Sequence, residues 1–192
     1  MAVNENRGVP SALVQLRQDH TNFAFLLDAL EREVNSLAAD GRGDAPLMLS
    51  IVAYFEGYPA IYHHPAEDVI YGHLLCHVPT FGERIFALLK DHEQLAGHTG
   101  HVRSVLEITD IHDPAGRRRI IDEVGDFIAD ERRHMSAEEQ SFFPNAARYL
   151  TTEQWAEVGR ARPQVKDRAF LNGGFDQALS EIKLAYLGRN PR

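Results

Sequence analysis

Apolar residues recur at spacings of three and four along most of the chain. This is the repeat of an amphipathic helix and not the alternation of a strand. The first such stripe predicts a helix from Ser11 to Ala39, which ends where glycines and aspartates break the pattern at residues 40–44. Because no segment shows a convincing strand pattern, we expect an all-α fold.

A second helix is expected to begin at Asp44 and Pro46, which have the spacing of a cap followed by a proline in the first turn. Its apolar stripe continues to Leu74. Pro59 and Pro65 lie inside the stripe, and each removes a backbone donor that a helix interior needs. The second helix is therefore predicted to be kinked or interrupted.

Two more stripes predict a third helix that ends near Ile108 and a fourth that starts at Asp113–Pro114 and stops at Pro144. The connections between the four helices are short, about 5 to 8 residues, which favours antiparallel neighbours. The chain is thus predicted to form an up-down-up-down four-helix bundle.

Additional helices are expected after the bundle. Thr151 and Gln154 have the spacing of a capping box and predict the start of a short helix. A last amphipathic stripe at 175–187 is expected to pack on the bundle or on a partner, for example in a homodimer. The expected organisation is a polar N-terminal lead, the bundle and a C-terminal helical extension: residues 1–10, 11–145 and 146–192.

The composition is that of an ordinary folded protein, with 44% hydrophobic and 25% charged residues. The net charge of −8 and the lack of a basic stripe argue against nucleic acid as a partner. No run approaches the length of a membrane span and no secretion signal is visible, so we expect a cytoplasmic protein without a membrane partner. Cys76, the single cysteine, excludes an intrachain disulfide and multi-cysteine metal sites, and is expected to be a small buried hydrophobe.

Histidine and glutamate occur in two similar sets. Each set has an Asp-His on one helix and a His-x-x-x-Glu pair on one face of the next. The lone histidine precedes the pair by 43 residues in the first set and by 42 in the second. Two related hairpins about a pseudo-twofold axis would bring six side chains into one inward cluster: His20, His63, Glu67, His92, His134 and Glu138.

Four imidazoles and two carboxylates suit two adjacent transition-metal ions. With no thiolate among them, the donors favour non-haem iron first and manganese next. Cations would also explain why carboxylates lie in a bundle core. The six residues leave coordination positions vacant for water, dioxygen or nitric oxide, and we expect Ala24 and Ala96, one turn from two ligands, to leave room there.

Other polar residues have alternative interpretations. His64, three residues before Glu67, could replace His63 as a ligand if Pro65 distorts the turn. The tyrosines at 54, 58 and 62 are expected to pack in the core. Four carboxylates either orient the imidazoles or are solvated: Asp19, Asp91, Asp130 and Glu139. Five histidines are expected to be ordinary surface or core residues: His73, His77, His98, His101 and His112.

At these residues the chain resembles the hemerythrin-like family, also called HHE cation-binding domains. The matching segments cover about residues 11 to 145: Asp19-His20, His63-His64-Pro65-Ala66-Glu67-Asp68, Asp91-His92-Glu93, and His134-Met135-Ser136-Ala137-Glu138-Glu139 running into Phe142-Phe143-Pro144. The resemblance implies a four-helix bundle with two non-haem iron ions joined by an oxo or hydroxo bridge. It implies four terminal ligands and two bridging carboxylates: His20, His63, His92 and His134, with Glu67 and Glu138.

Two positions differ from the oxygen-carrying members of this family. Those proteins look to have a further histidine where this chain has Ala96, and an aspartate where it has Glu139. The set of four histidines and two glutamates is more similar to di-iron proteins linked to nitrosative stress and to repair of iron–sulfur clusters. Those usually carry a small cysteine-containing domain ahead of the bundle, which a lead of ten polar residues cannot supply.

The leading hypothesis is a di-iron protein that binds dioxygen or nitric oxide reversibly, in sensing, stress protection or iron handling, and that is not a high-turnover enzyme. A di-iron enzyme is the first alternative: an oxidase, a peroxidase, a nitric oxide reductase or an iron–sulfur repair protein. The second alternative is a structural metal site, for example a zinc ion bracing the bundle.

Overall fold

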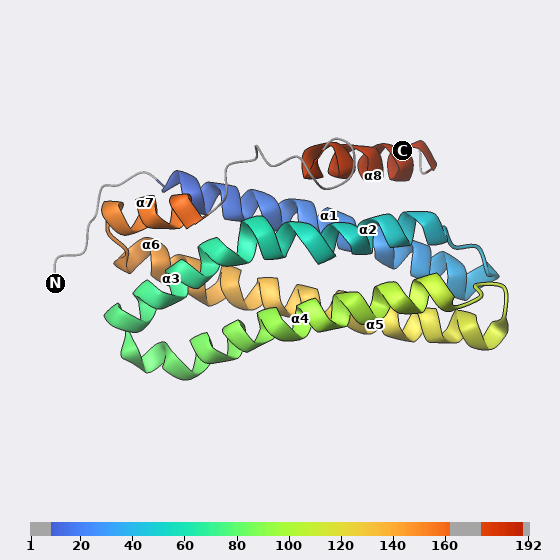
Figure 1. Ribbon diagram of the computed structural model, residues 1–192, viewed down its shortest axis with the longest axis horizontal. Helices are drawn as coiled ribbons and strands as arrows, with labels where there is room; N and C mark the ends of the chain where they lie inside the picture. The colour runs from blue at the N-terminus through green and yellow to red at the C-terminus, as the bar shows by residue number, and fades with distance from the viewer. Residues whose placement is uncertain (1–8, 162–173, 190–192) are drawn as a thin grey trace.

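The computed structural model describes residues 9–161 and 174–189, and in that part the chain forms helices joined by short turns (Figure 1). No strand occurs among these residues, which confirms the predicted all-α class. The first eight residues of the expected polar lead, and residues 162–173 and 190–192 of the expected extension, lie outside the described residues.

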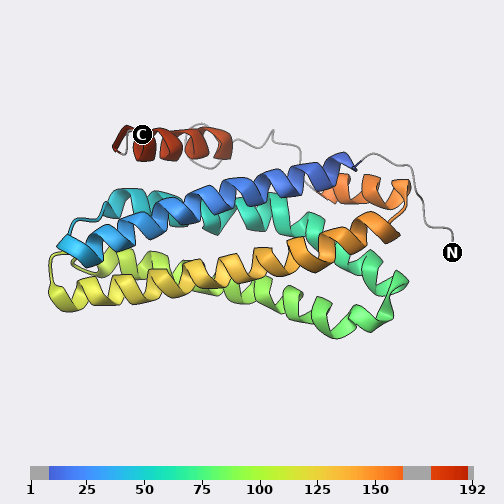
Figure 2. The ribbon, with the colours of Figure 1, turned by 180° about the vertical axis from the view of Figure 1, so that it is seen from behind.

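The elements from α1 to α6 form four helical columns. Successive columns run in opposite directions (Figures 1 and 2). The first column is α1 (Ser11–Asp40). The others contain short π or 3-10 turns, labelled η: α2 (Ala45–Tyr58), η1 (Pro59–His63) and α3 (His64–His77); η2 (Pro79–Phe81) and α4 (Gly82–Ile108); α5 (Pro114–Ala137), η3 (Glu138–Phe142) and α6 (Phe143–Tyr149). Both α1 and α4 pack against α2 and α5, so each column has two neighbours and one diagonal partner.

The predicted helix starts are confirmed by their caps. The Asp44 side chain accepts a hydrogen bond from the backbone N–H of Leu47 at 2.9 Å. In the same way Asp113 accepts from the backbone N–H of Gly116 at 2.8 Å. Each cap is followed by a proline in the first turn, where no intrahelical partner for an N–H is needed.

Prolines shape the two columns that carry the His-x-x-x-Glu pairs. Pro59 opens the π turn η1 and Pro65 lies in the first turn of α3, so the predicted interruption takes the form of a π turn within a continuous column. The prediction that Pro144 stops the fourth helix was wrong. Pro144 lies in the first turn of α6, directly after the π turn η3, and the helix continues to Tyr149 because a first turn tolerates the missing donor.

Two helices follow the bundle. In α7 (Thr152–Ala161) the expected capping box is present, since the backbone N–H of Thr151 donates to Oε1 of Gln154 at 2.9 Å and the Gln154 N–H donates to Oγ1 of Thr151 at 3.3 Å. This helix contacts α1 and α3. In α8 (Phe175–Arg189) the buried residues face α2, so the last amphipathic stripe packs on the bundle of its own chain (Figure 1).

The apolar core has two parts with a polar layer between them. One part includes Phe23, Tyr62 and Met135, and the other includes Leu16 and Phe142. Along every column, the histidines and glutamates of the predicted cluster lie between these two parts. The core therefore excludes bulk water from both ends of the polar layer.

Two further expectations concern surfaces. Cys76 is exposed, so the expectation of a buried cysteine was wrong. The buried positions of α3 include Glu67, Ile70 and Leu74, and Cys76 lies off that stripe. No helix in the described part of the chain is long and apolar enough to cross a membrane.

Candidate metal centre

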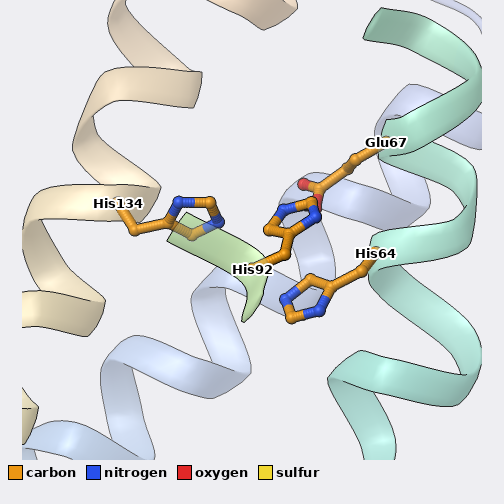
Figure 3. Close-up of side chains that lie close together, drawn as sticks. All are labelled: His64, Glu67, His92 and His134. Carbon is orange, nitrogen blue, oxygen red and sulfur yellow. The ribbon is translucent and has the colours of Figure 1, made fainter. Parts of the chain in front are cut away.

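The six predicted residues are all buried in the polar layer. Their potential ligand atoms form two groups, each with atoms within 4.8 Å of one another. The first group is His20, His63, Glu67 and Glu138, and the second is His64, Glu67, His92 and His134 (Figure 3). Glu67 belongs to both groups. The structure thus brings together every residue of the predicted cluster and adds His64 to it.

Each of the two glutamates lies between imidazoles from different helices. Oε1 of Glu67 is 2.8 Å from Nε2 of His63, and Oε2 of Glu67 is 3.6 Å from Nε2 of His92. Oε2 of Glu138 is 3.4 Å from Nε2 of His20, and Oε1 of Glu138 is 3.4 Å from Nε2 of His134. Because the two oxygens of each carboxylate face different histidines, both carboxylates have the placement that bridging of two ions requires.

The π turns adjoin these residues in both columns. One π turn ends at His63 and the other begins at Glu138. A π turn replaces i→i+4 with i→i+5 hydrogen bonds, which changes the direction of the side chains that follow, and such turns are frequent at functional sites. Sequence periodicity did not reveal them, since apolar spacing does not distinguish a single π turn from an α turn.

Carboxylates face the outer nitrogen, Nδ1, of all four predicted histidine ligands. The pairs and their distances are His20 with Glu139 at 3.1 Å, His63 with Asp19 at 3.1 Å, His92 with Asp68 at 3.2 Å and His134 with Asp91 at 3.8 Å. In each hairpin the acid before the lone histidine faces the histidine of the pair. The acid after the glutamate faces the lone histidine of the other hairpin. The pseudo-twofold pattern of the sequence therefore extends to the outer carboxylates.

Two of the outer carboxylates were assigned differently from the sequence. Asp130 faces Nδ1 of His98 at 3.1 Å, away from the cluster, and so does not orient a predicted ligand. Asp68 takes that role at His92 and was missed. Asp68 follows Glu67 just as Glu139 follows Glu138, and this equivalence was the signal that could have identified Asp68.

Tyrosine hydroxyls add two contacts that the sequence did not predict. The hydroxyl of Tyr58 donates to Oδ1 of Asp19 at 2.9 Å, so Tyr58 both packs in the core and fixes the acid that faces His63. The hydroxyl of Tyr71 donates to Oε1 of Glu138. The position equivalent to Tyr71 in the second hairpin is Phe142, which has no hydroxyl, so the two glutamates are in different environments.

Several buried polar atoms of the cluster lack a hydrogen bond of acceptable geometry. They are both carboxylate oxygens of Glu67, Oε2 of Glu138, Nε2 of His92, and both ring nitrogens of His134. A buried polar atom without a partner costs about 1–3 kcal/mol, and more when it is charged. Cations placed among these atoms would satisfy them together. The donor set therefore fits metal ions.

Residues 11–146 match the family model described as the hemerythrin HHE cation-binding domain. The chain belongs to this hemerythrin family. Neither a curated protein nor a solved structure matches the chain. The resemblance seen in the sequence motifs is thus confirmed at the level of the family, over most of the chain.

Protonation of the hemerythrin-type cluster follows from the close packing of its charges. Burial alone would lower the pKa of His20, but Glu138 and Glu67 raise it to about 10. Burial likewise opposes the charged form of His92, yet Asp68 and the two glutamates raise its pKa to about 11. Burial raises the pKa of Glu67, but His63 and His20 hold it well below its usual value. Without metal, imidazolium groups therefore compensate the carboxylates.

Two other titratable groups lie close to the cluster. Burial and the charge of His92 lower the pKa of His64 to about 3, which keeps its imidazole neutral. Burial, and then the carboxylate of Glu138, raise the pKa of Glu131 to about 8. Glu131 lies one turn before His134 and was not predicted as part of the site; no repeat partner marks it, because the equivalent residue of the first hairpin is Ala60.

The expected role of two alanines was wrong. Ala24 and Ala96 are exposed and do not border the cluster. The inward positions one turn after the lone histidines are taken by Phe23 and Leu95, which are buried. The Phe23 ring lies 5.0 Å from the His63 ring, centroid to centroid, with the two rings edge to face. A buried aromatic ring therefore lies against the cluster on the α1 side, where an opening was expected.

The remaining histidines make other contacts. His73 faces Glu157 at 2.9 Å and His101 faces Glu123 at 3.1 Å. Neither they nor His98 belong to the two groups of potential ligands among the described residues. Their ordinary ion-pair geometry agrees with the interpretation of these histidines as surface groups.

Proposed function

We propose that the protein holds two non-haem iron ions in this cluster and binds dioxygen or nitric oxide reversibly there, in sensing, stress protection or iron handling. The observation that supports this function most is the set of buried, unpartnered carboxylate oxygens and imidazole nitrogens on three of the four helical columns. Metal cations placed among these atoms would satisfy them together and would lower the free energy cost of burying them.

The chemistry of the donors favours iron. Imidazole together with carboxylate suits iron and, after it, manganese, whereas sites for softer ions use thiolates. Cys76 is exposed and does not belong to either group of potential ligands. When bound, a pair of iron ions with vacant coordination positions supplies reversible binding of small diatomic molecules. Manganese or zinc would fill the same donors but would not supply this chemistry in the same way.

The protein's own residues orient the ligands and keep the site dry. The carboxylates of Asp19, Asp68 and Glu139 face Nδ1 of their histidines, which directs the Nε2 atoms inward. His20 stacks on Phe143 with ring centroids 5.2 Å apart, and Phe23 covers His63. These contacts would exclude bulk water from a ligand bound between the two apolar halves of the core.

Gas binding can be tested on the iron-loaded, reduced protein under anaerobic conditions. Dioxygen or nitric oxide is added in known amounts while the visible absorption spectrum is recorded. The proposal expects saturation at a fixed ratio of gas to protein and return of the original spectrum when the gas is removed. A spectrum that does not change with either gas would contradict it and would favour a structural metal site.

One observation favours an enzyme as the second candidate. The hydroxyl of Tyr71 donates to a carboxylate oxygen of Glu138, so a proton donor lies within the cluster. Reduction of peroxide or nitric oxide consumes protons, and a hydroxyl hydrogen-bonded to a carboxylate of the cluster could pass a proton along this contact. Steady-state consumption of peroxide or nitric oxide with an added reductant would support an enzymatic function and contradict reversible binding.

A further inference from the structure

His64 provides a fifth imidazole at the edge of the cluster. It begins α3, directly after the π turn that ends with His63. In Figure 3, His64 and Glu67 extend from α3 toward His92 on α4 and His134 on α5. Consecutive residues of a regular helix point about 100° apart. Here the π turn lets both neighbouring histidines reach the interior, which is where a regular helix would place only one of them.

The His64 ring contacts the second group of potential ligands. It stacks on the ring of His92, with centroids 4.0 Å apart and planes inclined by 11°. Its centroid is 6.1 Å from that of His134. One ligand atom each from His64, Glu67, His92 and His134 lies within 4.8 Å of the others. Opposite ligands of one transition-metal ion lie about 4 Å apart, so this group is close to the spread that a single ion needs.

The other four histidines of the cluster each have a polar partner that His64 lacks among the described residues. Within residues 9–161 and 174–189, no hydrogen bond or ion pair reaches its ring, although the side chain is partly buried. The other four each have a carboxylate facing Nδ1. An imidazole in a polar cluster without a polar partner needs an explanation, and a metal ion would provide the missing interaction.

The two hairpins differ at this position. His64 follows His63, and the residue that follows His134 in the second hairpin is Met135. Met135 is buried in one of the two apolar parts of the core. A thioether suits soft ions and is a poor ligand for iron or manganese. The two halves of the site therefore differ at this position, because His64 of the first hairpin can bind iron or manganese and its counterpart Met135 is a poor ligand for them.

We propose that His64 is a ligand of the ion on the His92 and His134 side, in addition to His63 on the other side. This assignment rests on the metal-binding function proposed above and deepens it. The ion on the His92 and His134 side then has three imidazoles, and the ion on the His20 and His63 side has two. The two positions differ in their number of imidazole ligands, since the two glutamates lie between both sides. They therefore bind a given divalent ion with different affinities.

The test uses Co²⁺ alone, because its visible absorption reports the number and type of ligands. The metal-free protein, His64→Ala, His64→Gln and the control His98→Ala are titrated with Co²⁺, and circular dichroism checks that each is folded. We expect two ions per chain in the parent protein and in His98→Ala. In both His64 variants the affinity of one site falls by about tenfold or more, with a changed spectrum, while the other site is unaffected. Added imidazole restores the first site in His64→Ala.

The outcomes separate this assignment from the proposed function. If the parent chain binds two ions and both His64 variants bind them with unchanged affinities and spectra, His64 is not a ligand and the binuclear site stands. If the folded parent chain binds fewer than two ions, the binuclear function fails and the assignment fails with it. Loss of both sites in the His64 variants, without rescue by imidazole, would also overturn the assignment to one ion.

Discussion

Nδ1 of His63 lies 3.1 Å from Oδ2 of Asp19, and both side chains are buried. The other oxygen of Asp19 accepts a hydrogen bond from the hydroxyl of Tyr58 at 2.9 Å. Because Oδ2 of Asp19 accepts a hydrogen bond from Nδ1–H of His63, the lone pair of His63 Nε2 points toward Glu67, where a metal ion is proposed. Tyr58 and Asp19 thus act on the site through the orientation of His63, without belonging to either group of potential ligands.

Substitution of Asp19 by asparagine is expected to weaken metal binding. The amide can present its N–H₂ to His63 and so favour the tautomer whose lone pair points away from the cluster. Loss of such an orienting carboxylate lowers metal affinity by about 10–100-fold. The affinity is measured by competition with a chelator of known strength, at constant pH, in folded protein.

Asp130→Asn provides the matched control. Asp130 faces Nδ1 of His98 at the same distance, 3.1 Å, but outside the cluster. The affinity for metal should not change in this variant. Equal losses in Asp19→Asn and Asp130→Asn would show that the effect is one of general charge and would contradict the orienting role of Asp19.

Substitution of Glu67 by alanine is expected to remove at least one metal ion. Glu67 is the residue that belongs to both groups of potential ligands, and its oxygens face His63 and His92 from two sides. An ion present at a hundred times its Kd stabilises the folded state by about 2.7 kcal/mol. The increase in Tm on metal loading should therefore shrink in Glu67→Ala and in Glu138→Ala.

Glu123→Ala serves as the control for these glutamate variants, since Glu123 pairs with His101 away from the cluster. Metal content per chain and Tm are measured with and without metal for all three proteins. Full occupancy by two ions in Glu67→Ala or Glu138→Ala would refute the bridging assignment of that residue.

Metal loading at pH 7 is expected to release protons. The pKa of His20 is raised to about 10 and that of His92 to about 11, so both imidazoles are protonated in the metal-free protein at pH 7. A metal ligand must be a neutral imidazole, and both histidines must therefore lose a proton on binding. About two protons or more are expected per loaded chain, and metal affinity should rise with pH from 6 to 8.

The release can be measured in weakly buffered solution with a pH indicator during addition of a divalent metal. Substitution of His20 should lower the number of protons released, whereas His98→Ala should not. Binding of metal with no release of protons, and with affinity independent of pH, would contradict the protonated state of His20 and His92 in the metal-free protein.

Tyr71→Phe is expected to retain both metal ions and to lower the reduction potential of the centre. The hydroxyl of Tyr71 donates to Glu138, which withdraws negative charge from that carboxylate. Without it, Glu138 donates more strongly and stabilises the more oxidised metal. Potentiometric titration of iron-loaded Tyr71→Phe, with Tyr62→Phe as a control in the core, checks the shift. An unchanged or higher reduction potential in Tyr71→Phe would contradict this effect of the Tyr71 hydroxyl on Glu138.

Much of the fold follows from local chemistry that the sequence displays directly. The caps at Asp44 and Asp113 and the capping box at Thr151 involve residues three or fewer positions apart, so their hydrogen bonds could be predicted without tertiary information. The effect of Pro144 could not. Pro144 follows a π turn that includes the buried Glu138 and Phe142, and apolar spacing in the sequence does not reveal that turn.

The cluster itself was predictable because two hairpins repeat it, and repeated spacing of scarce residue types carries information that one histidine does not. What the sequence left open are contacts between hairpins. Asp68 faces a histidine of the other hairpin, and Tyr71 reaches a glutamate 67 residues away. The sequence predicts His64 only as a replacement for His63, since a regular helix turns neighbouring residues apart. The π turn η1 places both histidines at the cluster.

Metal analysis of the purified protein, produced with iron supplied, tests the central claim most directly. Iron, manganese and zinc are measured together and expressed per chain. The cluster of imidazoles and carboxylates predicts about two iron ions per chain. Zinc alone, or about one ion per chain, would contradict a di-iron centre. It would also contradict reversible binding of dioxygen or nitric oxide, because that proposal requires the pair of iron ions.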